Sequence, residues 1–223
     1  MEAILSNFFE LSVIARYLPD LLHGLMVTAE LAAAVVVTGL LAGTALAVLR
    51  SFHVKPVNAA IIVLVDVLRA LPPLMIIVVV FFGLPYLGVR LSGFFTSWLV
   101  LSLVLAAFTE ELVWAGMSSL VKGQWEAARS SGLTHLQAMV YVIVPQALRR
   151  VIAPLTSRVI ATVKNTSLAS VVGVSDLLAQ ASAALGYSAN ASPMMAAAIG
   201  YVLFLLPLVG FSRYLEVRYG WKH

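Results

Sequence analysis

Five long apolar stretches constrain the fold of this chain more than any other feature of its sequence. They cover residues 25–49, 57–84, 94–116, 148–172 and 194–211. Stretches of this length match the roughly 20 residues that an α-helix needs to cross a bilayer. Because backbone N–H and C=O groups cannot stay unpaired in hydrocarbon, spanning segments of this kind form helices. We therefore predict an all-α membrane protein with about five transmembrane helices.

The composition agrees with a bilayer as the solvent. The chain is 61% hydrophobic and 11% charged, with a mean hydropathy of +1.00, whereas charged residues make up about a quarter of a soluble domain. Cysteine is absent and the four histidines are scattered, so neither a thiolate site nor a metal-ligand spacing is present. We expect no metal site and no cysteine nucleophile.

Prolines and glycines in the first half of the chain predict a helix break and a close helix contact. Asp66 and Arg69 interrupt the 57–84 stretch, and Pro72 follows, which predicts a kinked helix or a short helix ahead of the span proper. Gly39 and Gly43 stand four residues apart in the first span. Such a pair lets a second helix approach closely, so we predict tight helix packing there.

The two ends of the chain are predicted to lie outside the spans. Residues 1–23 have apolar positions at helical spacing up to a break at Pro19, which indicates an amphipathic segment on the membrane surface. Glu2 stands where a secretory signal carries positive charge, so no cleavage is expected. Residues 173–193 form an outer loop with room for a short helix, and residues 219–223 form a cytoplasmic tail.

The distribution of Lys and Arg predicts the orientation. One face would hold nine of them, and the other only Arg16 and Arg90; the nine are Arg50, Lys55, Lys122, Arg129, Arg149, Arg150, Arg213, Arg218 and Lys222. Short loops rich in Lys and Arg stay in the cytoplasm. The N-terminus is therefore predicted outside, and the C-terminus and residues 123–145 inside. Because topology explains the basic charge, no nucleic-acid partner is expected.

Residues 123–145 predict a bent pair of helices on the cytoplasmic side. Helix-forming residues run from Gln124 to Ser131 and are followed by Gly132, a residue that tolerates the left-handed conformation closing a helix. Thr134 and Gln137 have the spacing of a capping box that opens a second helix, which Pro145 is expected to end. Such an elbow either docks into a groove on a partner or lies at the interface with no partner.

The spacing within this elbow resembles that of a known family. Glu126-Ala127-Ala128 is followed after three residues by Gly132, after nine more by Val142, and after one more by Val144-Pro145. This pattern resembles the EAA loop of the membrane subunits of bacterial ABC importers, with valines where isoleucine and leucine are usual. In that family the elbow is a coupling helix that sits in a cleft of a cytoplasmic ATPase.

The resemblance implies a fold and a set of contacts. The fold is that of a type I ABC importer permease. The contacts with the ATPase would come from residues of the elbow, namely Gln124, Glu126, Ala127, Ala128, Gly132, Leu133 and Pro145.

Further segments are similar to the polar amino acid branch of these permeases, over about residues 24–216. They are residues 69–74, Glu111 and residues 164–168, the last reading Lys-Asn-Thr-Ser-Leu. Trp114 and Ser157 depart from the branch, which has an arginine and commonly an asparagine there. The resemblance implies one permease domain over residues 24–218, in the bacterial cytoplasmic (inner) membrane.

The same resemblance implies the partners. No Gly-rich phosphate-binding loop ending in Gly-Lys-Ser/Thr occurs in the sequence, so ATP and Mg²⁺ are expected on a partner ATPase dimer and not on this chain. A second permease subunit, either the same chain or a paralogue, would complete the solute pathway by alternating access. A separate extracytoplasmic binding protein would deliver the amino acid, and membrane lipid would surround the spans.

Charged residues within the spans are the candidates for solute contact. A charge at the bilayer centre costs about 2.5 to 3.5 kcal/mol, so each one needs a partner or a water-filled cavity. Internal pairing with Asp66 or Glu111 is one explanation, and solute binding is the other. The candidate solute contacts are the charged residues Arg69, Glu111 and Lys164, together with the polar residues that follow Lys164, namely Asn165, Thr166 and Ser167. Asn165 stands where the family often has aspartate, which favours an acidic or neutral polar amino acid.

Two other classes of function compete with this interpretation. A self-sufficient ion-coupled transporter or channel would use Glu30, Glu110, Glu111 and Lys164 as a relay. An assembly or scaffold protein of the membrane is the second alternative. The two halves of the sequence show no inverted repeat, and neither alternative explains the cytoplasmic elbow.

Overall fold

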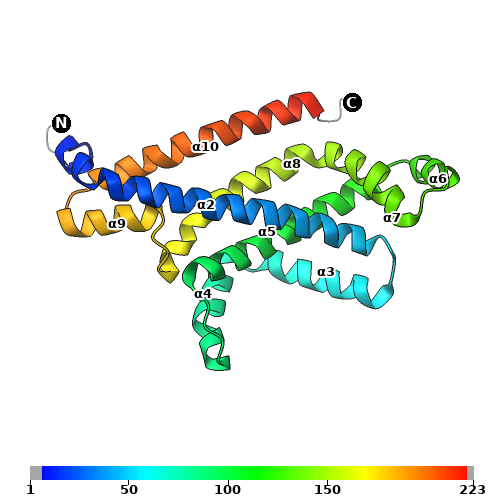
Figure 1. The fold of residues 1–223 in the computed structure, drawn as a ribbon, viewed down its shortest axis with the longest axis horizontal. Helices are drawn as coiled ribbons and strands as arrows, with labels where there is room; N and C mark the ends of the chain where they lie inside the picture. The colour runs from blue at the N-terminus through cyan, green and yellow to red at the C-terminus, as the bar shows by residue number, and fades with distance from the viewer. Residues whose placement is uncertain (1–6, 220–223) are drawn as a thin grey trace.

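The computed structural model describes residues 7–219, and within them the regular structure is helical (Figure 1). The elements are α2 (Leu11–Arg50), α3 (Lys55–Ala70), α4 (Pro73–Gly83), η1 (Leu84–Leu87), α5 (Gly93–Ser118), α6 (Lys122–Ser130), α7 (His135–Ala138), η2 (Met139–Ile143), α8 (Val144–Asn165), η3 (Thr166–Val172), α9 (Leu177–Ser188) and α10 (Ser192–Tyr219). The predicted all-α class is confirmed.

The predicted number of spans is also confirmed. Four helical segments are long and apolar enough to cross a membrane: α2, α5, residues 135–172 and α10. A fifth span results if α3 and the α4–η1 segment count as one, since they are bent by 103° at a short break. The break falls at Leu71, which has an extended backbone, and at Pro72. This is the interruption that Pro72 and Pro73 predict.

Helices α2 and α5 pack closely along the centre of the bundle. A Cβ atom on Gly39 would lie 2.8 Å from side-chain atoms of Leu105, and one on Gly43 would meet Ala106 and Thr109. Leu31 and Val35 of α2 are fully buried in the core that they form with α5. The predicted close approach at the two glycines is therefore confirmed.

Two predicted helix ends are wrong, and both involve proline. Helix α2 continues through Pro19, so residues 11–23 are part of a 40-residue helix; residues 1–6 lie outside the described part of the chain. Pro145 does not end the second elbow helix, because it occupies the first turn of α8, where a missing N–H is tolerated. The π turn η2 joins α7 to α8 without a break.

The two ends of the bundle differ in what they carry. Figure 1 places α6 and α7 at the end where α2 passes into α3, and the C-terminal end of α10 points the same way. Helix α9, in the predicted outer loop, packs beside the start of α2 at the opposite end. Gly24 makes this approach possible, because a Cβ there would lie 2.8 Å from the Asp176 carbonyl oxygen.

Candidate functional site

The elbow at one end of the bundle has the predicted helix-turn-helix shape. Helix α6 ends at a turn in which Gly132 adopts a φ of 85°. Thr134 and Gln137 then form the predicted capping box at the start of α7. The Arg129 guanidinium donates a hydrogen bond of 2.6 Å to the Leu133 carbonyl oxygen, which ties the end of α6 to the turn.

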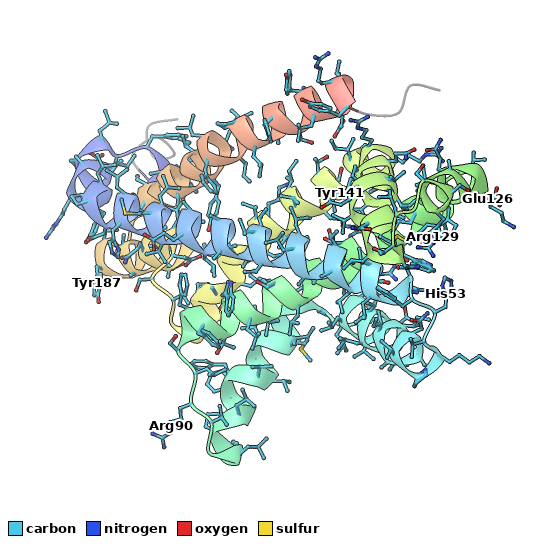
Figure 2. All side chains as sticks on the ribbon, turned by 45° about the vertical axis from the view of Figure 1, so that its right-hand side comes forward. His53, Arg90, Glu126, Arg129, Tyr141 and Tyr187 are labelled. Atoms are coloured by element: carbon cyan, nitrogen blue, oxygen red, sulfur yellow. The ribbon has the colours of Figure 1, made fainter. Side chains whose placement is uncertain are left out.

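Most residues with a predicted coupling role are on the surface of this elbow. The exposed ones are Gln124, Glu126, Ala127, Gly132 and Pro145. Leu133 is half-buried, and Ala128 is buried against the chain's own helices, so Ala128 shapes the elbow from inside. Figure 2 shows Glu126 and Arg129 at the far end of the molecule, where a partner could reach them.

A histidine that the sequence did not single out joins the elbow to α2. The His135 Nε2 atom lies 3.0 Å from the Ser51 hydroxyl oxygen. Its ring contacts both Phe52 and Trp125, with ring centroids 4.5 Å and 4.8 Å away. Ser51 and Phe52 directly follow α2, and Trp125 belongs to α6. The elbow therefore contacts the end of α2 as well as continuing into α8.

An ion pair next to this contact joins α2 to α5. Arg50 Nη1 lies 2.9 Å from Glu110 Oε1, and the Glu110 side chain is fully buried. The Arg50 guanidinium also stacks over the Trp114 ring, 4.5 Å from its centroid. Trp114 is one of the two residues that depart from the resembled branch, and here it packs against the arginine. The sequence shows that Glu110 is a charged residue in an apolar span, but it does not show that Arg50 is its partner.

A second group of charges joins α3 to α5. Arg69 Nη2 lies 2.6 Å from Glu111 Oε2, and its Nη1 lies 3.8 Å from Asp66. Of the two explanations for a charge in this span, the structure shows internal pairing for Arg69. Arg158 reaches this region from α8, where its guanidinium lies 4.2 Å from the Phe108 ring centroid. Both ion pairs border a cavity of about 230 Å³.

The remaining candidate solute contacts lie elsewhere, at the junction of α8 and η3. Lys164 is exposed in the last turn of α8, and within residues 7–219 no ion pair includes it. Thr166 is fully buried, and its hydroxyl donates to the Val163 carbonyl oxygen at 2.7 Å. The Ser167 hydroxyl donates to the Lys164 carbonyl oxygen at 2.9 Å. The structure thus brings Arg69 and Glu111 together and leaves Lys164 and its neighbours as a separate group.

A buried carboxylate, Asp176, lies at the opposite end of the bundle. Asp176 is fully buried, and its Oδ1 accepts the Ala179 N–H at 2.9 Å, which caps α9. Burial raises the pKa of Asp176 to about 6. The next residue, Leu177, donates its N–H to the Thr28 hydroxyl at 3.1 Å. These bonds hold α9 against α2.

Comparison with known proteins identifies the family. Residues 35–220 match the family described as "Binding-protein-dependent transport system inner membrane component". The probable glutamine ABC transporter permease protein GlnM of Bacillus subtilis (strain 168) is 39% identical over 177 residues, covering 79% of this chain and 82% of that protein. The glutamate/aspartate import permease protein GltK of Escherichia coli O157:H7 is 31% identical over 208 residues, covering 90% and 92%.

Solved structures agree with this assignment. A crystal structure of an amino acid ABC transporter with histidines has a TM-score of 0.81 at 29% identity, covering 92% of this chain and 96% of that one. An inward-facing MetNI methionine ABC transporter shares the fold, with a TM-score of 0.70 at 20% identity over 88% and 95% of the chains. The chain therefore belongs to the family of binding-protein-dependent transport system inner membrane components, with the type I ABC importer permease fold and a multi-pass location in the bacterial inner membrane.

Proposed function

We propose that this chain is the transmembrane permease subunit of an ATP-driven amino acid importer and that it receives the energy of ATP hydrolysis through its 123–145 elbow. The observation that carries the proposal is the elbow itself. It is a preformed bend, fixed by Gly132 and the Thr134 capping box, with Glu126 exposed at the end of the bundle. A partner that pushes on such a bend moves the helices that continue from it.

The elbow is connected to the bundle by two routes. Helix α7 continues through η2 into α8, which supplies Arg158 and Lys164. His135 contacts Ser51 at the end of α2, beside the Arg50–Glu110 pair. Alternating access requires a bundle with two arrangements whose balance a partner can change. An ATPase dimer that holds ATP and Mg²⁺ would be that partner.

A second permease subunit would complete the solute pathway. Helix α4 supports this part of the proposal, because it projects from the side of the bundle and is strongly apolar (Figure 1). Of its residues only Ile77 is buried, while Met75, Val79 and Phe82 are exposed. An extracytoplasmic binding protein would supply the amino acid to the pair from the α9 end.

The proposed solute is an acidic or neutral polar amino acid. Two supports point this way. Asn165 carries no negative charge beside Lys164, which disfavours a cationic side chain, and relatives with 39% and 31% identity are named for glutamine and for glutamate and aspartate. Lys164 would bind the solute carboxylate, with Asn165, Thr166 and Ser167 beside it. Arg69 and Glu111 would line the same pathway nearer the elbow.

Uptake by reconstituted proteoliposomes tests the proposal. We expect accumulation of glutamine or glutamate only when the permease, an ATPase with ATP inside, and a binding protein outside are all present. Uptake driven by an ion gradient without ATPase would reject the proposal in favour of an ion-coupled transporter. Preference for lysine or arginine over glutamine would reject the solute class alone.

Two substitutions separate coupling from solute binding. We expect Glu126→Arg to insert normally but to lose ATP-driven uptake, because Glu126 is exposed on the proposed ATPase contact. We expect Lys164→Met to keep the ATPase bound while uptake falls. Co-purification measures whether each variant still binds the ATPase. Normal uptake by Glu126→Arg would remove the elbow assignment, and normal uptake by Lys164→Met would return Lys164 to a structural role.

A further inference from the structure

An apolar groove runs between α2, α8 and α10 on one side of the bundle. It consists of two adjoining cavities of about 280 Å³ and 310 Å³ that share Val159 in their lining. The first is lined entirely by Ala, Val, Leu and Phe side chains, among them Ala33 and Phe204. Nothing in the proposed transport function uses this groove.

The lining decides what chemistry the groove accepts. A polar solute placed in the first cavity would lose its hydrogen bonds to water and find no partner, which is unfavourable by several kcal/mol per group. A hydrocarbon chain has no polar atoms and adapts to a narrow, irregular space. The groove therefore suits an acyl chain and excludes an amino acid.

The second cavity is also apolar, and polar residues stand beside it at the elbow end of the bundle. Arg149 lines it together with Thr156 and Tyr219. The Glu216 carboxylate already accepts hydrogen bonds from Thr156 and Ser212, each at 3.0 Å. Arg149 is exposed, and in the described part of the chain it enters no ion pair. A basic group at the cytoplasmic end of an interhelical groove attracts a lipid phosphate.

The groove lies on the side of the bundle away from the surface that we assign to the second permease. Figure 1 shows α10 along one side of the bundle and α4 projecting from the opposite side. The exposed apolar arm of α4 is the surface that we assign to the second permease. The α10 side is then left to the bilayer.

We propose that this groove binds an anionic phospholipid of the cytoplasmic leaflet, with one acyl chain along the two cavities and its phosphate on Arg149. The lipid joins α10 to α2 and α8, and it stabilises the arrangement of these helices. The proposal does not depend on the transported solute, because lipid retention is measured without uptake.

Native mass spectrometry of the purified transporter tests the proposal. We expect the complex of permease and ATPase to retain phosphatidylglycerol or cardiolipin in mild detergent. Arg149→Gln should lower the retention of anionic lipid about fivefold, the contribution expected of one interfacial arginine. Ala33→Trp should lower the retention of all phospholipid at this site, because the indole fills the first cavity. Lys55→Gln, on the same membrane face but outside the groove, is the control and should change nothing.

Three results would overturn the proposal. The first is a wild-type complex that carries no phospholipid. The second is equal retention of anionic phospholipid by Arg149→Gln and wild type, and the third is a second permease chain packed in the groove. The last is tested with Ile152→Cys, since the chain has no cysteine of its own and Ile152 lines the second cavity. We expect no disulfide-linked permease dimer on oxidation; efficient formation of one would assign the groove to another copy.

Discussion

Glu110 is a fully buried carboxylate in a membrane helix, and its charge is tolerated because Arg50 lies 2.9 Å away. The pair connects the cytoplasmic end of α2 to α5. The second carboxylate oxygen of Glu110, Oε2, has no hydrogen-bond partner among the described residues. A pair of this kind is therefore sensitive to the loss of either member.

We expect Arg50→Met to lower the free energy of unfolding by about 3–5 kcal/mol, because it leaves the Glu110 charge buried and unpaired. The double variant Arg50→Met/Glu110→Leu should recover most of this loss, because both charges are removed together. Thermal unfolding in detergent measures both effects. Lys55→Met, an exposed substitution on the same side of the bundle, is the control. Equal losses in the single and double variants would show that the ion pair is not the cause.

Asp176 predicts a pH dependence of stability at the other end of the bundle. Burial raises its pKa in the folded protein to about 6 from an ordinary value of 3.8. The folded state therefore binds the proton more tightly than the unfolded state between these values, and stability falls as the pH rises from about 4 to about 6. Above that range the contribution of Asp176 is constant.

We expect Asp176→Asn to remove this part of the pH dependence. Asparagine keeps an acceptor for the Ala179 N–H and so preserves the cap of α9, but it carries no charge to bury. The melting temperature of the variant should exceed that of the wild type at pH 7, and the difference should vanish toward pH 4. A difference in melting temperature between the variant and the wild type that stays the same from pH 4 to pH 7 would show that Asp176 is not the source of this pH dependence.

At the scale of elements, Gly132 sets the angle between α6 and α7. Its φ of 85° is left-handed, and a Cβ there would meet no atom within 4 Å, so a substitution brings backbone strain and no clash. The strain for a residue other than glycine is about 1–2 kcal/mol. We expect Gly132→Ala to lower solute-stimulated ATPase activity in the assembled transporter.

Gly123 provides a matched control for this prediction. It lies in the same elbow, within α6, and a Cβ there also meets nothing within 4 Å. Its backbone is not left-handed, so Gly123→Ala should leave the stimulation unchanged. Equal losses from both substitutions would mean that the elbow surface, and not its bend, is what matters.

The elements that the sequence predicts well are those with local signals. Gly132 and the Thr134 capping box act within a few residues, so the elbow is predictable from sequence. Pro19 and Pro145 mislead because the rule that proline ends a helix is local. Helix α2 continues through Pro19, and Pro145 falls in the first turn of α8, where a missing N–H is tolerated. The fold as a whole follows from the apolar stretches.

The candidate site is less predictable, because its partners are distant in sequence. His135 and Ser51 are separated by 84 positions, and Arg50 and Glu110 by 60. A single sequence shows that Glu110 is unusual in a span, but not which residue neutralises it. The pairing of Arg69 was easier to predict, since Asp66 lies one helical turn away.

At the scale of the whole molecule, the apolar arm α4 packs on the core through Ile77 and leaves Met75, Val79 and Phe82 exposed. Phe82 is 55% exposed on it, and Val202 is equally exposed, at 55%, on α10 at the opposite side. Both positions would face lipid in an isolated permease. In the proposed assembly only Val202 does so.

A photo-crosslinking amino acid at these two positions distinguishes the alternatives. We expect benzoylphenylalanine in place of Phe82 to give an adduct with the mass of two permease chains, because α4 would pack against the second subunit. The same substitution of Val202 should give lipid adducts only. The mass of the Phe82 adduct also tells whether the second chain is identical or a paralogue. Lipid adducts alone at both positions would leave α4 in the bilayer, and the second subunit would then have to contact another surface.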